Sequence, residues 1–410
     1  MLRVTKKEKS WILYDWGNSA FTMTMLATIL PIYFTAMVGE AGLSKEMATS
    51  YWGYTNAIAS LIVAVLSPFM GGLADYMGVK KKFFTIFSML GIIFSGMITF
   101  IPYGHWQLLM ATYIISLIGF SLSNVFYDSF LTDITTEERM DMISSLGYAF
   151  GYIGSTIPFI ICMGIIMAAQ KSILPISTIT ASKISFFITT MWWLIFTLPM
   201  LKNVDQIHGK PYEKYRFKDS IAMLRKSFYR VRKNRKAFLF LCAYFFYIDG
   251  VDTIIRMAAS FGTTVGINST TLLVILLVTQ FIAFPFAIIY GKLAQIFKGK
   301  AMLIAGICVY IVICIFAFFL KSAREFWILS ILVGSSQGGI QALSRSYFAK
   351  MIPKENSNEY FGFYNIFGKF AAIMGPFLVG IVTQITGDVR NGVLSLILIF
   401  IIGGVLLLKD

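Results

Sequence analysis

The chain has 410 residues, of which 57% are hydrophobic and 13% charged, and it carries a formal net charge of +15. A soluble domain usually contains about a quarter charged residues. The composition therefore excludes a soluble globular protein and favours a chain whose apolar surface is solvated by lipid. The excess Lys and Arg residues are spread over separate loops, which argues against a nucleic-acid partner.

Twelve apolar stretches follow one another along the chain, separated by charged, proline-containing or polar segments. A membrane-spanning helix needs roughly 20 mainly apolar residues. The stretches therefore predict an all-α membrane protein with twelve transmembrane helices. They cover residues 11–38, 48–74, 83–101, 106–128, 142–169, 183–201, 237–261, 269–290, 301–320, 326–348, 360–384 and 391–408.

Lys and Arg gather at the N-terminus and in alternate loops, with one Lys at the C-terminus, and they are sparse in the other loops. By the positive-inside rule we expect both termini in the cytoplasm. The basic segment 202–236 divides the chain into six-helix halves at 1–201 and 237–410. Its apolar residues recur with helical spacing. They predict an amphipathic helix that either lies on the anionic leaflet or is a solvated linker. These residues are Phe217, Ile221, Leu224, Phe228 and Val231.

The two halves repeat one another. The segment that begins at Gly71 and contains Asp75 is matched after the eighth stretch by one that begins at Gly291. Asp15 in the first helix is matched by Asp249 in the seventh. Asp128 and Asp133 match Arg345 and Lys350, in the fourth and tenth. These matches occur in chain order at similar offsets and predict two pseudo-symmetric six-helix units.

Polar side chains concentrate in the first, fourth, seventh and tenth helices, whereas the third, sixth, ninth and twelfth are nearly uniformly apolar. Ionisable groups are costly in hydrocarbon and normally face a protein interior or an aqueous cavity. We therefore expect these four helices to line a central pathway. Their polar residues are Asp15, Asn18, Asn124, Asp128, Asp249, Asp252, Arg256, Gln337, Gln341 and Arg345.

The loop Gly71, Asp75, Gly78 and Lys80 resembles the loop between helices two and three of major facilitator transporters. The run from Trp11 to Phe21, with Pro31, Tyr33 and Phe34 after it, is similar to the start of the autophagy-related vacuolar effluxer family and its bacterial relatives. Two further segments, 249–254 and 341–346, resemble marks of that family. The resemblance covers the whole chain.

This resemblance implies the major facilitator fold and a secondary transporter that alternates access between two halves. Fungal members of the family are associated with amino-acid efflux from the vacuole, so amino-acid transport is a possible activity. A bacterial relative would lie in the plasma membrane as a multi-pass protein. We expect a monomer in contact with membrane lipids.

Intramembrane carboxylates are the first candidates for a substrate or coupling site. Asp15 and Asn18 share one helical face, as do Asp249 and Asp252, with Arg256 one turn further on. We expect Asp15 and Asp249 to meet across the axis between the halves and to carry a coupling proton. For Asp252, an internal ion pair with Arg256 is an equal alternative.

Cations in the tenth and eleventh helices offer a second set of contacts. Arg345 is expected either to pair with Asp128 across the halves when one gate closes, or to hold a substrate carboxylate or phosphate. Lys369 could serve the same purpose, or extend to the cytoplasmic surface. Neutral contacts are assigned to Tyr148, Tyr152, Gln341, Tyr364 and Asn365.

The loop after the second helix predicts a gate. Asp75 can accept hydrogen bonds at a helix N-terminus and pair with a cation, while Gly71 and Gly78 allow a tight turn and close helix approach. Lys80 belongs to the same loop and also supports the orientation. Asp133, at the inner end of the fourth helix, is a predicted partner of this latch.

No nucleotide-binding loop, nucleophile motif or metal-ligand spacing occurs, so we expect no enzyme activity and no cofactor. The four cysteines fall inside predicted helices as packing residues. The energy source is then an ion or substrate gradient, with H⁺ favoured by the carboxylates over Na⁺. The function expected is transport of a small polar solute, such as a zwitterion. The alternatives are a lipid or amphiphile translocator, and a membrane sensor that does not transport.

Overall fold

The computed structural model describes residues 4–211, 220–264 and 266–409. Twelve of its helices are long and apolar enough to cross a membrane, which confirms the number predicted from hydropathy. The predicted extents also agree, although several helices continue beyond the apolar stretch by one or two turns. Phe217 of the predicted linker helix lies outside the described residues.

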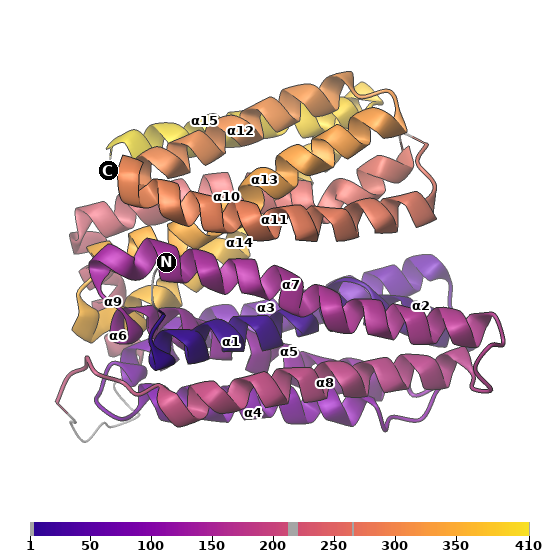
Figure 1. The fold of residues 1–410 in the computed structure, drawn as a ribbon, viewed down its shortest axis with the longest axis horizontal. Helices are drawn as coiled ribbons and strands as arrows, with labels where there is room; N and C mark the ends of the chain where they lie inside the picture. The colour runs from indigo at the N-terminus through magenta and orange to yellow at the C-terminus, as the bar shows by residue number, and fades with distance from the viewer. Residues whose placement is uncertain (1–3, 212–219, 265, 410) are drawn as a thin grey trace.

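The first six spans form the lower bundle of Figure 1, which we call the N-terminal bundle. Its first span is interrupted by a π-helical turn, and its fourth ends in a short extra helix. The elements are α1 (Lys6–Phe21), η1 (Thr22–Ala27), α2 (Ile29–Glu40), α3 (Lys45–Ala74), α4 (Lys80–Ile98), α5 (Trp106–Ser129), α6 (Leu131–Ile134), α7 (Glu137–Gln170) and α8 (Thr178–Asn203).

The last six spans form the upper, C-terminal bundle, and a separate helix, α9 (Ser220–Lys233), precedes them. These spans are α10 (Arg235–Thr264), α11 (Ser269–Phe297), α12 (Gly299–Phe319), α13 (Ala323–Met351), α14 (Ser357–Thr386) and α15 (Val389–Lys409), with the 3-10 turn η3 (Lys354–Asn356) before α14.

Prolines interrupt corresponding helices of the two bundles. Pro68 lies inside α3 and Pro285 inside α11, the second span of each bundle. Pro158 lies inside α7 and Pro376 inside α14, the fifth span of each. A proline inside a helix removes one backbone hydrogen bond and favours a bend. Pro199 lies inside α8 as well, but the second and fifth spans are the ones that carry an internal proline in both bundles.

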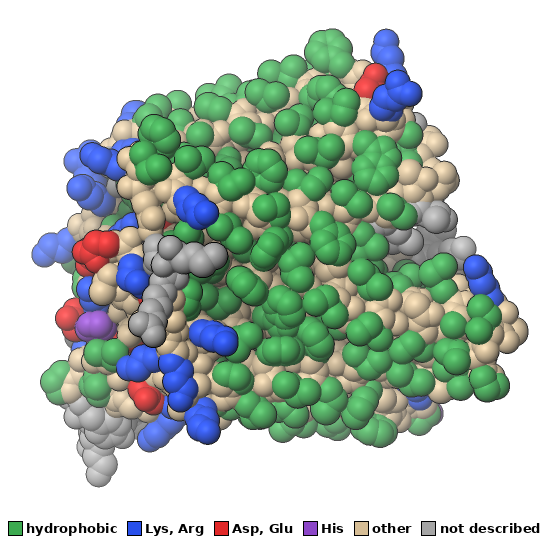
Figure 2. All heavy atoms as spheres, in the orientation of Figure 1, with side chains coloured by type: hydrophobic (Ala, Val, Ile, Leu, Met, Phe, Trp, Pro, Cys, Tyr) green, Lys and Arg blue, Asp and Glu red, His purple; other side chains and the backbone are tan. Residues whose placement is uncertain are grey.

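Both chain ends and α9 lie at one end of the molecule, which we call the basic end; we call the other the far end (Figure 1). Lys and Arg side chains gather around the basic end in Figure 2, and the surface between the two ends is mostly hydrophobic. Exposed apolar side chains within the spans include Leu61 and Phe377. A hydrophobic band between polar ends is the surface that a bilayer requires.

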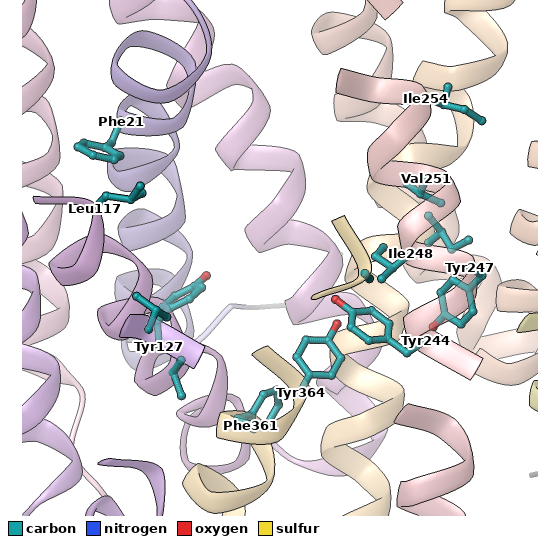
Figure 3. Packing of buried hydrophobic residues seen from close by; sticks show 14 of the residues in the cluster. Phe21, Leu117, Tyr127, Tyr244, Tyr247, Ile248, Val251, Ile254, Phe361 and Tyr364 are labelled. Carbon is teal, nitrogen blue, oxygen red and sulfur yellow. The ribbon is translucent and has the colours of Figure 1, made fainter. Parts of the chain in front are cut away.

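Stacked aromatic rings lie in the core of each bundle. In the N-terminal bundle Trp11 stacks on Tyr127 with ring centroids 4.4 Å apart. In the C-terminal bundle Tyr364 of α14 lies beside Tyr244 of α10, as Figure 3 shows, with centroids 4.2 Å apart. The first pair packs the first span against the fourth in the N-terminal bundle. The second pair packs the first span against the fifth in the C-terminal bundle.

Candidate functional site

Arg345 of α13 reaches out of the C-terminal bundle into the N-terminal bundle. Its Nη1 donates to Asp128 Oδ1 at 2.9 Å and lies 3.6 Å from Asp15 Oδ2. Its Nε and Nη2 donate to the hydroxyl and the backbone carbonyl of Ser144, both at 3.0 Å. The Arg345 side chain is 2% exposed, so this is a buried ion pair between the two bundles.

Three aromatic rings enclose the same guanidinium. Its Cζ lies 4.6 Å from the ring centroid of Trp11, 5.4 Å from that of Tyr127 and 4.5 Å from that of Tyr148. Tyr127 also donates a hydrogen bond to Asp15 at 3.1 Å. The two carboxylates exceed the single cation by one negative charge, and they are 13% and 19% exposed. We call Asp15, Asp128 and Arg345 the acidic cluster.

Gly147 of α7 makes this approach possible. A Cβ at that position would lie 2.9 Å from Arg345 Nη2 and 2.9 Å from Trp11. Any larger residue would therefore push the arginine away from the carboxylates. The close approach of α7 to α1 and α13 depends on the missing side chain.

A second charged group lies on the C-terminal bundle and consists of Asp252 and Arg256 of α10 and Lys369 of α14. Gln341 lies within hydrogen-bonding reach of Asp252 and accepts a hydrogen bond from Tyr152 at 3.1 Å. Arg256 is exposed although it lies within a span-length helix. The two cations exceed the carboxylate by one positive charge. We call Asp252, Arg256 and Lys369 the basic cluster.

Lys369 joins the bundles rather than extending to the surface of the basic end. Its Nζ donates to Ser121 Oγ of α5 at 3.1 Å. Asn18 donates to Asn124 Oδ1 at 2.6 Å within the N-terminal bundle. Tyr364 stacks against Tyr244 and is 6% exposed, so it serves packing more than a cavity wall.

Asp249, unlike the other predicted substrate or coupling carboxylates, belongs to neither charged cluster. It is 0% exposed and accepts one hydrogen bond, from the backbone N–H of Gly375 in α14, at 2.8 Å. The expectation that Asp15 and Asp249 meet is wrong for this conformation. Asp15 faces the cation of the opposite bundle, whereas Asp249 faces a helix of its own bundle. Matched positions in a repeat place side chains on equivalent faces, and equivalent faces do not have to touch.

The loop after α3 closes on the first turn of α14. Asn358 donates to Asp75 Oδ1 through its backbone N–H at 2.9 Å and through its side chain at 3.1 Å. This is the contact predicted for Asp75 at a helix N-terminus. A Cβ at Gly71 would collide with the Asn358 carbonyl, so glycine is required there. Gly78 has φ +77°, which glycine adopts without strain.

Two carboxylates and one lysine form the inner part of this contact. Lys210 Nζ lies 3.6 Å from Asp75 Oδ2 and 3.6 Å from Glu359 Oε2. Burial raises the pKa of Asp75 to about 7, a change that nearby Glu359 increases and Lys210 opposes. Asp75 lies just beyond the end of its span, at the basic end.

Lys80 is fully buried, which the sequence did not predict. Its Nζ pairs with Asp133 at 2.7 Å and donates to Ser357 of α14 at 3.0 Å. The backbone N–H groups of Ile207 and His208 donate to the other oxygen of Asp133 at 2.9 and 2.8 Å. The predicted partner of the latch is therefore present, and the start of the linker participates as well.

Three further interactions at the basic end were missed. Asp141 of α7 accepts from Lys350 Nζ at 2.6 Å and from Ser346 at 2.7 Å. Arg230 of α9 pairs with Glu359. The repeat offers the signal that was overlooked, because Asp141 and Asn358 occupy matching positions at the starts of α7 and α14. Each one is contacted by the opposite bundle.

Within the described chain, the polar contacts between the bundles lie in the half of the molecule nearest the basic end. Along α7 they run from Glu137, paired with Lys354, to Tyr152, bonded to Gln341. Among the described residues, no hydrogen bond or ion pair joins the two bundles beyond Tyr152 on this helix, which continues to Gln170. Hydrogen bonds and ion pairs between the described parts of the two bundles are therefore confined to the half of the molecule nearest the basic end.

An apolar cavity lies inside the C-terminal bundle. Along α10 it extends from Thr253 to Phe261, which is toward the far end. Helices α11, α12, α13, α14 and α15 complete its wall. Several lining side chains carry a hydroxyl or an amide. These are Thr253, Thr279, Gln280, Ser330 and Gln337.

The twelve spans in two bundles define a major facilitator transporter. The human organic anion transporter MFSD10 superposes with a TM-score of 0.75 at 12% identity, covering 98% of this chain and 99% of that one. The proton:xylose symporter XylE superposes with a TM-score of 0.72 at 13% identity, covering 98% and 94%. At these identities the likeness concerns the fold.

Residues 4–141 and 132–409 match the model of the family described as vacuole effluxer Atg22 like, and the chain belongs to this family. It is 52% identical to the uncharacterized MFS-type transporter YxiO of Bacillus subtilis, covering 99% of this chain and 95% of that protein. It is 22% identical to autophagy-related protein 22 of Coccidioides immitis, covering 96% and 85%. The chain is therefore a membrane transporter of this family and not an enzyme.

Proposed function

We propose that this transporter moves a small zwitterionic solute, such as an amino acid, by alternating access coupled to H⁺. The observation that carries the proposal is the presence of two clusters of opposite net charge, the acidic cluster and the basic cluster. The acidic cluster has one surplus negative charge and the basic cluster one surplus positive charge. An ammonium group would bind beside Asp15 and Asp128, and a carboxylate beside Arg256 and Lys369.

The basic end is the cytoplasmic end in this proposal. Its Lys and Arg side chains follow the positive-inside rule, and both chain ends are marked there in Figure 1. Lys45→Cys and Asp388→Cys should then react with an impermeant thiol reagent added to intact cells. Lys233→Cys, in α9, should react only after permeabilisation. The reverse pattern would overturn the orientation.

The gate at the basic end supports alternating access. Asp75, Lys80 and Lys210 hold the loop after α3 against α14, while Asp141 holds the start of α7 against α13. Opening toward the cytoplasm requires all these contacts to break together. The structure then corresponds to a state closed to the cytoplasm, with the far end free to admit solute.

A ligand screen tests the substrate class. Thermal melting of the purified protein is measured with amino acids, nucleosides, sugars and lysolipids, because a ligand that binds the folded state raises the melting temperature. We expect stabilisation by zwitterionic amino acids, and its loss in both Lys369→Met and Asp128→Asn. Stabilisation by neutral sugars that survives both substitutions would refute the charge-pairing argument.

The apolar cavity favours one second candidate, an amphiphile translocator. Its wall of side chains such as Ile254, Phe261 and Leu396 would accept a hydrocarbon chain. In the same screen, lysolipids would then stabilise the protein more than amino acids. Ile254→Trp, which fills the cavity, would abolish their effect while leaving any effect of amino acids unchanged.

A further inference from the structure

The groups described above around the Arg345 guanidinium all belong to the N-terminal bundle, although Arg345 itself belongs to the C-terminal bundle. Two carboxylates, three aromatic rings and two oxygens of one serine contact it. We call this set the cation cage. Its members are Trp11 and Asp15 of α1, Tyr127 and Asp128 of α5, and Ser144 and Tyr148 of α7. Separation of the bundles therefore removes the occupant of the cage and leaves its walls together.

Contacts within the N-terminal bundle hold the walls of the cage in place. The indole N–H of Trp11 donates to the backbone carbonyl of Tyr127 at 2.8 Å, and the two rings stack on each other. The Tyr127 hydroxyl donates to Asp15. Tyr14 packs on the other side chain of this group, Tyr127, with ring centroids 4.8 Å apart. None of these contacts involves Arg345, so the site is preorganised for a cation that replaces it.

The cage without Arg345 would carry two negative charges and no cation. Asp15 and Asp128 supply these charges, and both lie within helices that span the hydrocarbon. Uncompensated charges at this depth are costly, so another positive charge has to take the place of Arg345 when the bundles part. Both carboxylates are partly exposed even while Arg345 is bound. A cation from solution can therefore reach them.

The chemistry of the cage matches a guanidinium better than other cations. One oxygen of each carboxylate and two oxygens of Ser144 lie within 3.6 Å of the Arg345 nitrogens, and a guanidinium offers them a fixed fork of N–H donors. A quaternary ammonium has no N–H donor and would leave these oxygens unpaired. A hard metal ion requires oxygen ligands, whereas much of this wall consists of aromatic rings, which attract weakly hydrated organic cations.

We infer that the cation cage binds a guanidinium group of the transported solute, and that Arg345 fills the cage when no solute is bound. This inference rests on the proposed transport of a zwitterion and names the cationic group that the zwitterion carries. The cage has no room for two guanidinium groups, since a single carbon added to Gly147 would lie 2.9 Å from both Arg345 Nη2 and Trp11. Solute binding therefore displaces Arg345 and breaks the ion pair between the bundles, and solute release restores it.

Chemical rescue of Arg345→Ala tests whether the vacated cage binds a free guanidinium. Melting of the purified full chain is measured with millimolar methylguanidinium chloride, and with NaCl at the same ionic strength. We expect the salt of the organic cation to raise the melting temperature of this variant by several degrees, in a saturable way. Methylammonium and tetramethylammonium should act more weakly. Adding Tyr148→Leu to Arg345→Ala should weaken the binding of methylguanidinium by about tenfold, through loss of one cation–π contact.

Lys350→Ala is the matched control for the rescue. It also removes a cation between the bundles, at Asp141, and leaves Arg345 in the cage. The Lys350 side chain is partly exposed, and a single carboxylate open to water holds a free cation weakly. Methylguanidinium should therefore change the melting of this variant no more than NaCl does. Equal rescue of both variants would show that a carboxylate alone is sufficient, which would overturn the cage.

A second measurement uses the wild type and does not depend on the folding of Arg345→Ala. Free L-arginine and L-citrulline have nearly the same shape, but citrulline carries a neutral urea group in place of the guanidinium. We expect L-arginine to raise the melting temperature of the wild type and L-citrulline to have little effect. The response to L-arginine should be lost in Asp128→Asn, which removes one charge of the cage. Equal stabilisation by the two solutes would overturn the inference.

The remaining outcomes separate this inference from the proposed function. Stabilisation by amino acids that lack a guanidinium, lost in Lys369→Met and Asp128→Asn, would keep the proposed function and overturn the inference. Recovery of Arg345→Ala at lower pH, with no response to methylguanidinium, would also overturn it, because protons would then neutralise the vacated cage. Rescue of Arg345→Ala by methylguanidinium, without binding of any amino acid to the wild type, would refute the proposed solute and with it the role of the cage in transport.

Discussion

Two carboxylates at matched positions of the repeat have opposite surroundings. Asp15 lies beside Arg345 of the other bundle and receives a hydrogen bond from Tyr127. Asp249 lies against its own bundle, with one backbone donor and one oxygen without a partner. A charge paired across the bundles loses its partner when they separate. A charge within one bundle keeps its neighbours, and only a proton can neutralise it. The surroundings of Asp15 therefore suit a gate between the bundles, and the surroundings of Asp249 suit proton coupling.

The largest effect should follow the loss of the cation between the bundles. Arg345→Gln leaves Asp15 and Asp128 facing each other without compensation, and breaking a buried pair costs about 3–5 kcal/mol. We expect a markedly lower melting temperature in detergent, and partial recovery in Arg345→Lys. The double variant that combines Arg345→Gln with Asp128→Asn should melt at a higher temperature than Arg345→Gln alone. Wild-type melting in Arg345→Gln would show that the acidic cluster does not hold the bundles together.

The same substitution at the two carboxylates should give different results. Asp15→Asn weakens a charge-assisted contact with Arg345, and hydrogen bonds to charged groups contribute about 1.5–3 kcal/mol. Asp249→Asn keeps an oxygen that can accept from the Gly375 N–H and breaks no ion pair, so we expect a change of less than about 0.5 kcal/mol. Thermal melting of the two variants side by side measures this. Equal losses would remove the distinction between the two sites.

Asp75 predicts a pH dependence of the gate. Burial raises its pKa to about 7 in the closed gate, above the ordinary value of about 3.9 expected once the gate opens to water. The closed gate is therefore favoured fully below the ordinary value, and this advantage is lost as the pH rises through about 7. Reactivity of a cysteine introduced at Ser129, which the gate covers, should increase over that range.

Asp75→Asn removes this titration and keeps the shape of the acceptor. We expect ligand binding to survive, solute turnover to fall, and the cysteine reactivity to become independent of pH. Normal turnover in a reconstituted assay would show that Asp75 is not part of the latch.

The smallest effect on melting and transport is expected for a substitution of Lys81, which is next to the buried Lys80 of the gate. Lys81 pairs with Asp205 at 2.6 Å, but both are substantially exposed, and such pairs contribute about 0–1 kcal/mol. Lys81→Met should melt and transport as the wild type does, whereas Lys80→Met should loosen the gate and lower the melting temperature. A similar loss in both variants would mean that the loop, and not the buried ion pair, determines the effect.

Hydropathy predicted the spans because the bilayer requires a fixed length of apolar helix. The loop around Asp75 was predicted because its glycines and carboxylate have a mechanical use at a helix end. The residues that pair with the charged side chains of the gate were harder to predict. Lys80 sits in a basic run like its neighbours, and its burial depends on how α4 turns against Asp133. The pairing of Lys350 with Asp141, and not with the matched Asp133, depends on which helices face each other in one conformation.

Asp249 shows the limit most clearly. Its helix and its intramembrane depth were evident from the chain, and they predicted a coupling role. Its neighbour in space, Gly375, is a residue without a side chain, 126 positions away in sequence. No pattern of charges along the chain indicates a contact that is made by a backbone N–H beside a proline.

Proton uptake measured together with solute flux in liposomes tests the central claim most directly. The wild type and Asp249→Asn are reconstituted in parallel, with the solute that stabilises the protein in the melting screen. We expect the wild type to move protons with the solute and to accumulate it against a gradient. Asp249→Asn should exchange the solute without moving protons. Proton movement in Asp249→Asn equal to that of the wild type would contradict the account.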